Sequence, residues 1–300
     1  MKKIFTIVFS FVFIQMVNSQ TMLDQAMTAY QDQNYESAMK LIEAVVQDEK
    51  FVNDPYAWHL RGYIYKDYFK KVENEKSDSP NRQIAIDSYI KSRELDANNE
   101  FLDNNLGNLK YLAVCFYNDA VRTMDTVNYN ASLDYYEKYK KYYSVYDPAM
   151  KYKESDIKYY NALASVVFKR YDSKNPATDK YFDQTVDIYK KVLDLDTSDC
   201  FANEQMGILY YNKGVDLIMN IDIENADIIE IAKKQDECNA FWAISLPYLL
   251  RAYRHCEGKA NLYNIIEGIK GIYHGLDEKE NYDRWDQIQK RETPENNGDK

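Results

Sequence analysis

The sequence predicts an all-α protein, an α-solenoid of stacked antiparallel helix pairs. Four observations favour this class. Four similar junctions recur along the chain, and five segments repeat a spacing of four and then three positions, which places the residues on one face of a helix. The chain has nine glycines and six prolines among 300 residues, too few for a turn-rich β-protein. Its length exceeds the usual size of one compact core, which suits two domains or an elongated array.

The first 19 residues have the layout of a secretory signal peptide. Residues 1–3 are Met-Lys-Lys, and an uncharged apolar run follows over residues 4–17. This run of 14 residues is shorter than a membrane-spanning helix, which needs roughly 20. Cleavage is expected after Ser19, and no cysteine follows that could be acylated. The sequence therefore predicts an exported protein, periplasmic or secreted, that is not a lipoprotein.

Four junctions mark where one helix pair is expected to end and the next to begin. Each joins an apolar helix end to an aspartate, a proline or small residue, and an aromatic or apolar residue; the aspartates are Asp54, Asp96, Asp147 and Asp196. Aspartate suits a helix N-cap because its carboxylate accepts a free backbone N–H, and proline suits the first helical position. Aspartate is therefore expected as the N-cap, and each junction as the end of one helix pair and the start of the next.

The second helix of each pair is predicted from a small residue, a large residue four positions later and a third residue seven positions later. These triplets are Ala38, Ile42 and Val45; Ala85, Tyr89 and Ser92; Ser132, Tyr136 and Tyr139; Thr185, Tyr189 and Val192; Ser245, Leu249 and Ala252. A small residue lets two helices approach closely, and the larger ones fill the space against the next pair. A single pair cannot bury its apolar stripe, so neighbouring pairs must stack.

The first helices carry a related spacing. Trp58, Gly62 and Tyr65 are followed later by Gly207 and Tyr210, and Gly107 supplies the small residue alone. These spacings resemble the tetratricopeptide repeat, whose first helix follows W-x-x-L-G-x-x-Y and whose second follows A-x-x-x-F-x-x-A. The resemblance covers most of residues 21–275, although no repeat is complete and the units are longer than the family's, which have about 34 residues.

The resemblance implies a right-handed superhelix of five or six helix pairs without catalytic activity. It also implies that a protein or peptide partner in the cell envelope contacts the first helices. The residues expected to contact the partner are Trp58, Arg61, Tyr65, Asn104, Asn108, Asn203, Tyr211 and Asn212. The residues expected to pack the repeats are Ala38, Gly62, Ala85, Tyr89, Gly107, Tyr136, Tyr189, Gly207, Tyr210 and Ala252.

Polar inserts account for the extra length. The largest, residues 219–237, is long enough to hold an additional helix. Residues 261–273 are expected to form the last first-type helix, and residues 281–290 a polar capping helix. The repeat domain is thus expected over residues 20–290, with residues 291–300 as a disordered tail.

The four cysteines allow two interpretations. Cys115 lies in an apolar stretch and is expected to be a buried thiol that packs as a small hydrophobe. In an exported protein, a disulfide can form between two of Cys200, Cys238 and Cys256, where it would hold a long segment between helices in place. The sequence does not determine which two are paired.

The 29 tyrosines suggest an alternative function. Tyr135, Tyr139, Tyr142 and Tyr146 step by four, three and four, so they share one helix face. This face is expected to be a packing stripe, but exposed rings would also serve protein or sugar recognition. An exported glycan-binding module is therefore the alternative to a protein-interaction scaffold.

Other function classes find little support in the sequence. Without residues 1–19 the chain has 36 basic and 48 acidic residues, a net charge of −12 that disfavours nucleic-acid binding. The three histidines, His59, His255 and His274, lack the paired spacing of a zinc site. No nucleophile elbow, metalloprotease, phosphate-loop or dinucleotide motif is present. We therefore expect no enzyme, no metal and no cofactor.

Overall fold

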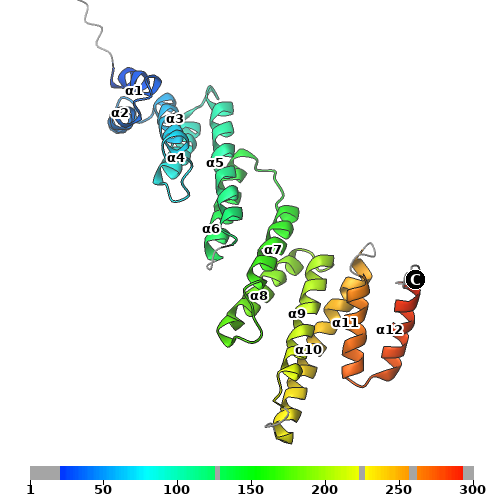
Figure 1. Ribbon diagram of the computed structural model, residues 1–300. Helices are drawn as coiled ribbons and strands as arrows, with labels where there is room; N and C mark the ends of the chain where they lie inside the picture. Colours follow the sequence, from blue (N-terminus) through cyan, green and yellow to red (C-terminus); the bar gives the residue numbers. More distant parts are fainter. Residues whose placement is uncertain (1–20, 126–128, 223–226, 257–261, 293–300) are drawn as a thin grey trace, which may run out of the picture. The chain divides into compact units, whose positions relative to one another are not determined.

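The computed structural model describes residues 21–125, 129–222, 227–256 and 262–292, and these form twelve α-helices, one short 3-10 helix and no strand (Figure 1). The helices of the first half are α1 (Met22–Gln31), α2 (Tyr35–Gln47), α3 (Pro55–Lys71), α4 (Pro80–Leu95), α5 (Leu102–Arg122) and α6 (Asn130–Tyr146). Those of the second half are α7 (Lys153–Phe168), η1 (Pro176–Thr178), α8 (Asp179–Leu195), α9 (Cys200–Met219), α10 (Ile228–His255), α11 (Leu262–Gly275) and α12 (Lys279–Glu292). The expected signal peptide and residues 293–300 of the expected tail lie outside the described residues.

Consecutive helices pack against each other in pairs, with α1 against α2, α3 against α4, α7 against α8, α9 against α10 and α11 against α12. The rings of Phe116 and Tyr142 stack 5.6 Å apart and join α5 to α6. This arrangement confirms the predicted all-α solenoid class. Two compact units divide the chain: residues up to 119 together with 135–149, and residues 120–134 together with 150 onward. We refer to the odd-numbered helices, the first of each pair, as A helices and to the even-numbered ones as B helices.

Close helix packing in the first unit depends on a glycine opposite an aromatic ring. Gly62 of α3 faces the ring of Tyr89 of α4, and both Tyr89 and Ala85 are fully buried. Ile42 of α2 and Leu112 of α5 belong to the same apolar core. The small-then-large pattern of the B helices therefore marks the core of this unit.

In the second unit, Gly207 of α9 faces Leu249 of α10 in the same way. Ser245, one turn earlier on α10, donates a hydrogen bond to the carbonyl oxygen of Gly207 at 2.7 Å. A disulfide between Cys200 and Cys256 joins the start of α9 to the end of α10. Cys115 and Cys238 are buried free thiols. The sequence predicted a buried thiol for Cys115.

The junction aspartates have two different structural roles. Asp54 is the N-cap of α3, as predicted, and its carboxylate accepts the backbone N–H two residues on. All four junctions lie between a B helix and the next A helix, as predicted. For Asp96, Asp147 and Asp196 only the N-cap role is wrong, because each lies just after a B helix and its carboxylate accepts backbone N–H groups of the following turn. The N-cap of α9 is instead Asp199.

The long insert lengthens an existing helix. Within the described residues, α9 ends at Met219 and α10 runs without a break from Ile228 to His255, so the additional helix expected in residues 219–237 is absent there. α11 and α12 occupy the segments expected for the last A helix and for the capping helix. None of the described helices is long and apolar enough to span a membrane.

Candidate functional site

Two hollows lie along the A helices of the second unit and share Asn212 of α9. The first, about 380 Å³, lies between the end of α7 and α9; the second, about 310 Å³, lies between α9 and α11. We call the two together the A-helix groove. The first is lined by Phe168, Tyr171, Asp172, Ser173, Leu209, Asn212, Lys213, Val215 and Asp216. The second is lined by Ile208, Tyr211, Asn212, Leu249, Asn264, Glu267 and Gly268.

The α9–α11 hollow has an apolar floor held in place by aromatic packing. The ring of Tyr211 stacks on Trp242 with centroids 6.1 Å apart, and the indole N–H of Trp242 donates to the carbonyl oxygen of Tyr211 at 3.3 Å. A Cβ at Gly271 of α11 would overlap the Tyr211 hydroxyl, so this glycine makes room for the ring. Burial raises the pKa of Tyr211, which keeps its hydroxyl protonated.

The rim of this hollow is polar and exposed. Asn212 comes from α9, and Asn264 and Glu267 come from α11; all three side chains are exposed to solvent. A side-chain amide carries both a hydrogen-bond donor and an acceptor, as a peptide bond does. The hollow can therefore hold an apolar side chain on its floor while its rim pairs with the backbone of a bound peptide.

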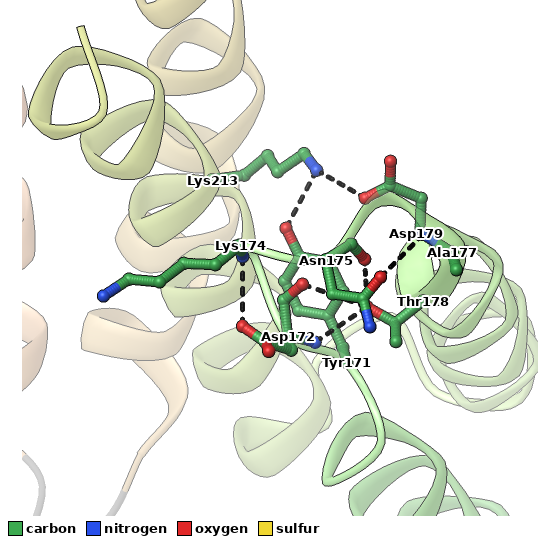
Figure 2. A network of polar contacts seen from close by, with 8 residues as sticks. All are labelled: Tyr171, Asp172, Lys174, Asn175, Ala177, Thr178, Asp179 and Lys213. Carbon is green, nitrogen blue, oxygen red and sulfur yellow. Dashed lines mark hydrogen bonds and ion pairs between the residues drawn. The ribbon is translucent and has the colours of Figure 1, made fainter. Parts of the chain in front are cut away.

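The α7–α9 hollow is organised by Lys213, which Figure 2 shows reaching from α9 to the turn before α8. Its ammonium group donates to the hydroxyl of Tyr171 at 2.8 Å and pairs with Asp179 at 3.1 Å. Partial burial alone would lower the pKa of Lys213, but hydrogen bonds with Tyr171 and Asp179 outweigh this and raise it. Lys213 therefore stays charged and fixes one wall of the groove.

The turn itself is closed by its own side chains (Figure 2). The hydroxyl of Thr178 accepts the backbone N–H of Asp172 at 3.0 Å and donates to backbone carbonyl oxygens within the turn. The carboxylate of Asp172 accepts the N–H of Lys174, and the side chain of Asn175 accepts the N–H of Ala177. These bonds hold the turn in one conformation beside the hollow.

Of the residues expected to contact a partner, Tyr211 and Asn212 line the groove, whereas Asn203 does not. Asn203 is fully buried. Its amide oxygen accepts from Arg251 at 2.9 Å, and its amide nitrogen donates to the carbonyl oxygens of Thr197 and Asp199. Asn203 therefore stabilises the start of α9 and is not accessible to a partner.

Three other expected contacts, Trp58, Arg61 and Tyr65, form a cluster where α3 meets α2. Arg61 pairs with Glu43 of α2 at 2.8 Å, and the hydroxyl of Tyr65 donates to the same carboxylate at 2.6 Å. The guanidinium group lies 5.5 Å from the ring of Trp58 and 5.1 Å from that of Tyr65. Tyr65 is buried and the other two are half-buried, so the cluster joins neighbouring helix pairs.

Asn104 and Asn108 lie on α5 in the first unit. Asn104 is exposed, and the half-buried Asn108 accepts a hydrogen bond from Lys66 of α3 at 3.1 Å. They lie on an A helix, as expected, but neither residue lines the A-helix groove.

Most residues expected to pack the repeats are buried, namely Ala38, Gly62, Ala85, Tyr89, Tyr136, Tyr189, Gly207 and Ala252. Tyr210 is half-buried and its ring stacks with Tyr248 at 6.3 Å. Gly107 is exposed, and a Cβ there would meet no atom within 4 Å. Where α5 approaches α6, the small residue is Ala120, whose carbonyl oxygen accepts from Ser132 at 2.7 Å.

The tyrosine face of α6 packs inside the protein. Tyr142 is buried, and Tyr135, Tyr139 and Tyr146 are half-buried. Among the described tyrosines, only Tyr117 and Tyr263 are exposed, by 39% and 52%. The glycan-binding alternative, which needs exposed rings, therefore has no support from this face.

The groove also contains residues that sequence reasoning missed, above all Lys213, Asn264 and Glu267. One signal was available, because a Tyr-Asn pair recurs in the last four A helices, at residues 117–118, 160–161, 211–212 and 263–264. Lys213 carries no such signal, since its partner Asp179 is 34 positions away in the sequence.

One group of described residues has the composition of a metal site. Ligand atoms of Cys200, Glu204 and Cys256 lie within 4.8 Å of one another. Both sulfur atoms belong to the disulfide, so neither is available as a thiolate. The group therefore does not fit a metal ion while the disulfide is formed.

No protein-family model matches the sequence, and no curated protein matches it. Among solved structures, a tetratricopeptide repeat protein from Parabacteroides merdae is similar over 92% of this chain and 93% of its own, with 14% identity and a TM-score of 0.23. The assignment to an all-α helix-pair class therefore depends on the packing of this chain's own helices.

Proposed function

We propose that this chain is an exported, non-catalytic scaffold that binds an extended segment of a partner protein along the A-helix groove. The observation that carries the proposal is the pair of hollows that share Asn212, with an apolar floor between exposed amide groups. An extended peptide needs pockets for alternate side chains and hydrogen-bonding groups for its backbone. The groove supplies both from three successive A helices.

Two features support export to the cell envelope. The chain begins with a basic segment and an uncharged apolar run over residues 4–17, typical of a secretory leader. The disulfide between Cys200 and Cys256 suits an oxidising compartment such as the periplasm or the exterior. The partner is accordingly a protein or peptide of the envelope, and the net acidity of the chain disfavours a nucleic acid.

The binding proposal is tested with peptides selected from a random 12-residue display library on the purified chain. The double variant Asn212→Ala/Asn264→Ala removes both rim amides. It is expected to lower the affinity of the chain for the selected peptides by roughly tenfold or more, equivalent to about 1.4 kcal/mol of binding free energy. Both side chains are exposed, so the fold is expected to persist. Fluorescence anisotropy measures the affinities.

The matched control is Asn53→Ala, which removes an exposed asparagine from the turn before α3. It is expected to leave peptide affinity unchanged. If the library yields no peptide above a blank surface, or if the double variant binds as tightly as the unaltered chain, the groove is not a peptide site.

A further inference from the structure

The most exposed large apolar side chains of the described residues gather at one end of the α9–α10 pair. Ile228 is 82% exposed, and Met219 and Ile229 are each 75% exposed, whereas the next in rank, Tyr263, is 52% exposed. Ile231 lies in the same turn of α10 and is also exposed. We call Met219, Ile228, Ile229 and Ile231 the α9–α10 tip. Such a concentration is unusual on a surface that faces only water.

A charged hollow of about 290 Å³ lies beside the tip and is lined by residues of both helices. Asp216 lies in the last turn of α9, Asp222 follows this helix, and Glu230 stands between Ile229 and Ile231 on α10. The hollow also contains Lys213 and Lys234, but Lys213 pairs with Asp179, and Lys234 pairs with Glu237 at 3.3 Å. Within the described part of the chain, Asp216 and Glu230 have no ion-pair partner. The hollow therefore leaves negative charge uncompensated beside an apolar surface.

We propose that the tip and this hollow bind a segment of a partner protein in which apolar side chains adjoin lysine or arginine. Charge complementarity selects this occupant. Acidic groups beside the isoleucines repel an anionic membrane surface, and they repel the same groups on a second copy of the chain. A basic apolar segment would bury the isoleucines and place a cation next to Asp216 and Glu230. The charged hollow shares Tyr171, Ser173, Lys213 and Asp216 with the A-helix groove, whereas the four residues of the tip lie outside the groove and give the proposed scaffold a second contact.

The probe is a fluorescein-labelled helical peptide built of leucine and lysine, compared with two relatives in which glutamate replaces lysine or serine replaces leucine. The leucine–lysine peptide is expected to bind the purified chain, more weakly as salt rises, and the two relatives are not. Ile228→Ser/Ile229→Ser and Glu230→Lys are each expected to weaken binding by roughly tenfold. All three positions are exposed, so these variants are expected to fold.

Two controls separate this site from general attraction between a basic peptide and an acidic protein. Glu280→Lys reverses an exposed charge in the first turn of α12, as Glu230→Lys does in α10. Val121→Ser removes an exposed apolar side chain of α5. Both controls should bind the peptide like the unaltered chain. Equal losses in the controls and the tip variants would overturn the proposal.

Other outcomes would also overturn it. These are binding of the glutamate peptide with equal affinity, dimerisation in sedimentation velocity that Ile228→Ser/Ile229→Ser abolishes, or binding to phosphatidylcholine vesicles that depends on the same isoleucines. Asn212→Ala/Asn264→Ala is expected to leave the affinity for the leucine–lysine peptide unchanged. A failure at the tip is thus distinguishable from a failure of the groove.

Discussion

Gly62 lies so close to Tyr89 that a Cβ at this position would be 2.6 Å from the ring. Tyr89 is fully buried and cannot move aside without disturbing its neighbours. Gly62→Ala is therefore expected to destabilise the first unit by about 1–3 kcal/mol, the usual cost of overpacking. Urea unfolding followed by circular dichroism measures the change.

Gly107→Ala is the matched control, because it lies in helix α5 with open space around it. Alanine is preferred over glycine inside a helix by about 0.5–1 kcal/mol, so this variant should be as stable as the unaltered chain or slightly more stable. Equal destabilisation by both substitutions would show that the contact with Tyr89 does not determine the effect.

The disulfide between Cys200 and Cys256 spans 56 residues of sequence and closes one end of the α9–α10 pair. Cys200→Ser/Cys256→Ser is expected to lower the free energy of unfolding by about 2–4 kcal/mol, chiefly because the unfolded chain gains freedom. Dithiothreitol should lower the unfolding midpoint of the unaltered chain by a similar amount and leave that of the variant unchanged. If the reductant lowers both midpoints equally, the bridge is not the cause.

His59 is buried among aromatic rings and its Nδ1 lies 2.8 Å from the side-chain oxygen of Asn105. Burial lowers its pKa, an effect that Lys66 reinforces and that Asn105 and Asp96 oppose. The unfolded chain then binds the proton more readily, so stability is full above about pH 6.5 and is lost as the pH falls below that value. His59→Gln should reduce the slope of unfolding midpoint against pH between 7.5 and 5.5. An unchanged slope would contradict the assignment to His59.

At the residue scale, the spacing of small and large residues along the sequence predicted those contacts between paired helices that depend on local register. Gly62 and Tyr89 follow the expected pattern and do meet. Gly107 and Asn203 were placed by analogy with other helices, and the structure puts the first in open space and the second inside the fold. The length of α5 explains the first error, because its contact with α6 through Ala120 lies 13 residues further along than Gly107.

At the scale of elements, a buried lysine joins the terminal helix α12 to α11. Lys270 pairs with Asp286 at 2.9 Å and donates to Gln289, both on α12. Hydrogen bonds from Lys290 and Lys270 lower the pKa of Asp286 to about 2, so this carboxyl stays ionised above that pH. Lys270→Met keeps the apolar stem and removes the charge, and we expect faster amide hydrogen exchange throughout α12.

Lys290→Met is the control for this experiment. Lys290 pairs with the same carboxylate at 2.8 Å, but it is exposed and belongs to α12 itself, so its loss does not detach the helix. Exchange in α12 should change little. If the two variants accelerate exchange equally, Lys270 is not what holds α12 in place.

Helix starts and ends were predicted best where a cap is encoded in neighbouring residues, as for Asp54 and Pro55 at α3. The start of α10 at Ile228 was missed, although Asp227 caps it by accepting two backbone N–H groups. Residues 219–237 were expected to be a polar insert with an additional helix, and the continuity of one 28-residue helix depends on packing against α9.

For the whole molecule, the repeat pattern was sufficient to predict the class of fold but not the location of the groove. The hollows arise where side chains of α7, α9 and α11 converge, and those residues are far apart in sequence. Asn212 was predicted from the resemblance to the tetratricopeptide repeat, whereas the role of Lys213 depends on its contacts with Tyr171 and Asp179. A binding surface of this kind is a property of stacked pairs.

The central claim is that a partner segment lies along the A helices, and site-specific photo-crosslinking tests it most directly. A benzophenone side chain replaces Asn212 in the groove or, as control, the exposed Asp187 of α8, a B helix. The probe is a peptide selected on the unaltered chain. The account predicts crosslinking from position 212 and none above background from position 187. Equal or stronger crosslinking from position 187 would contradict it.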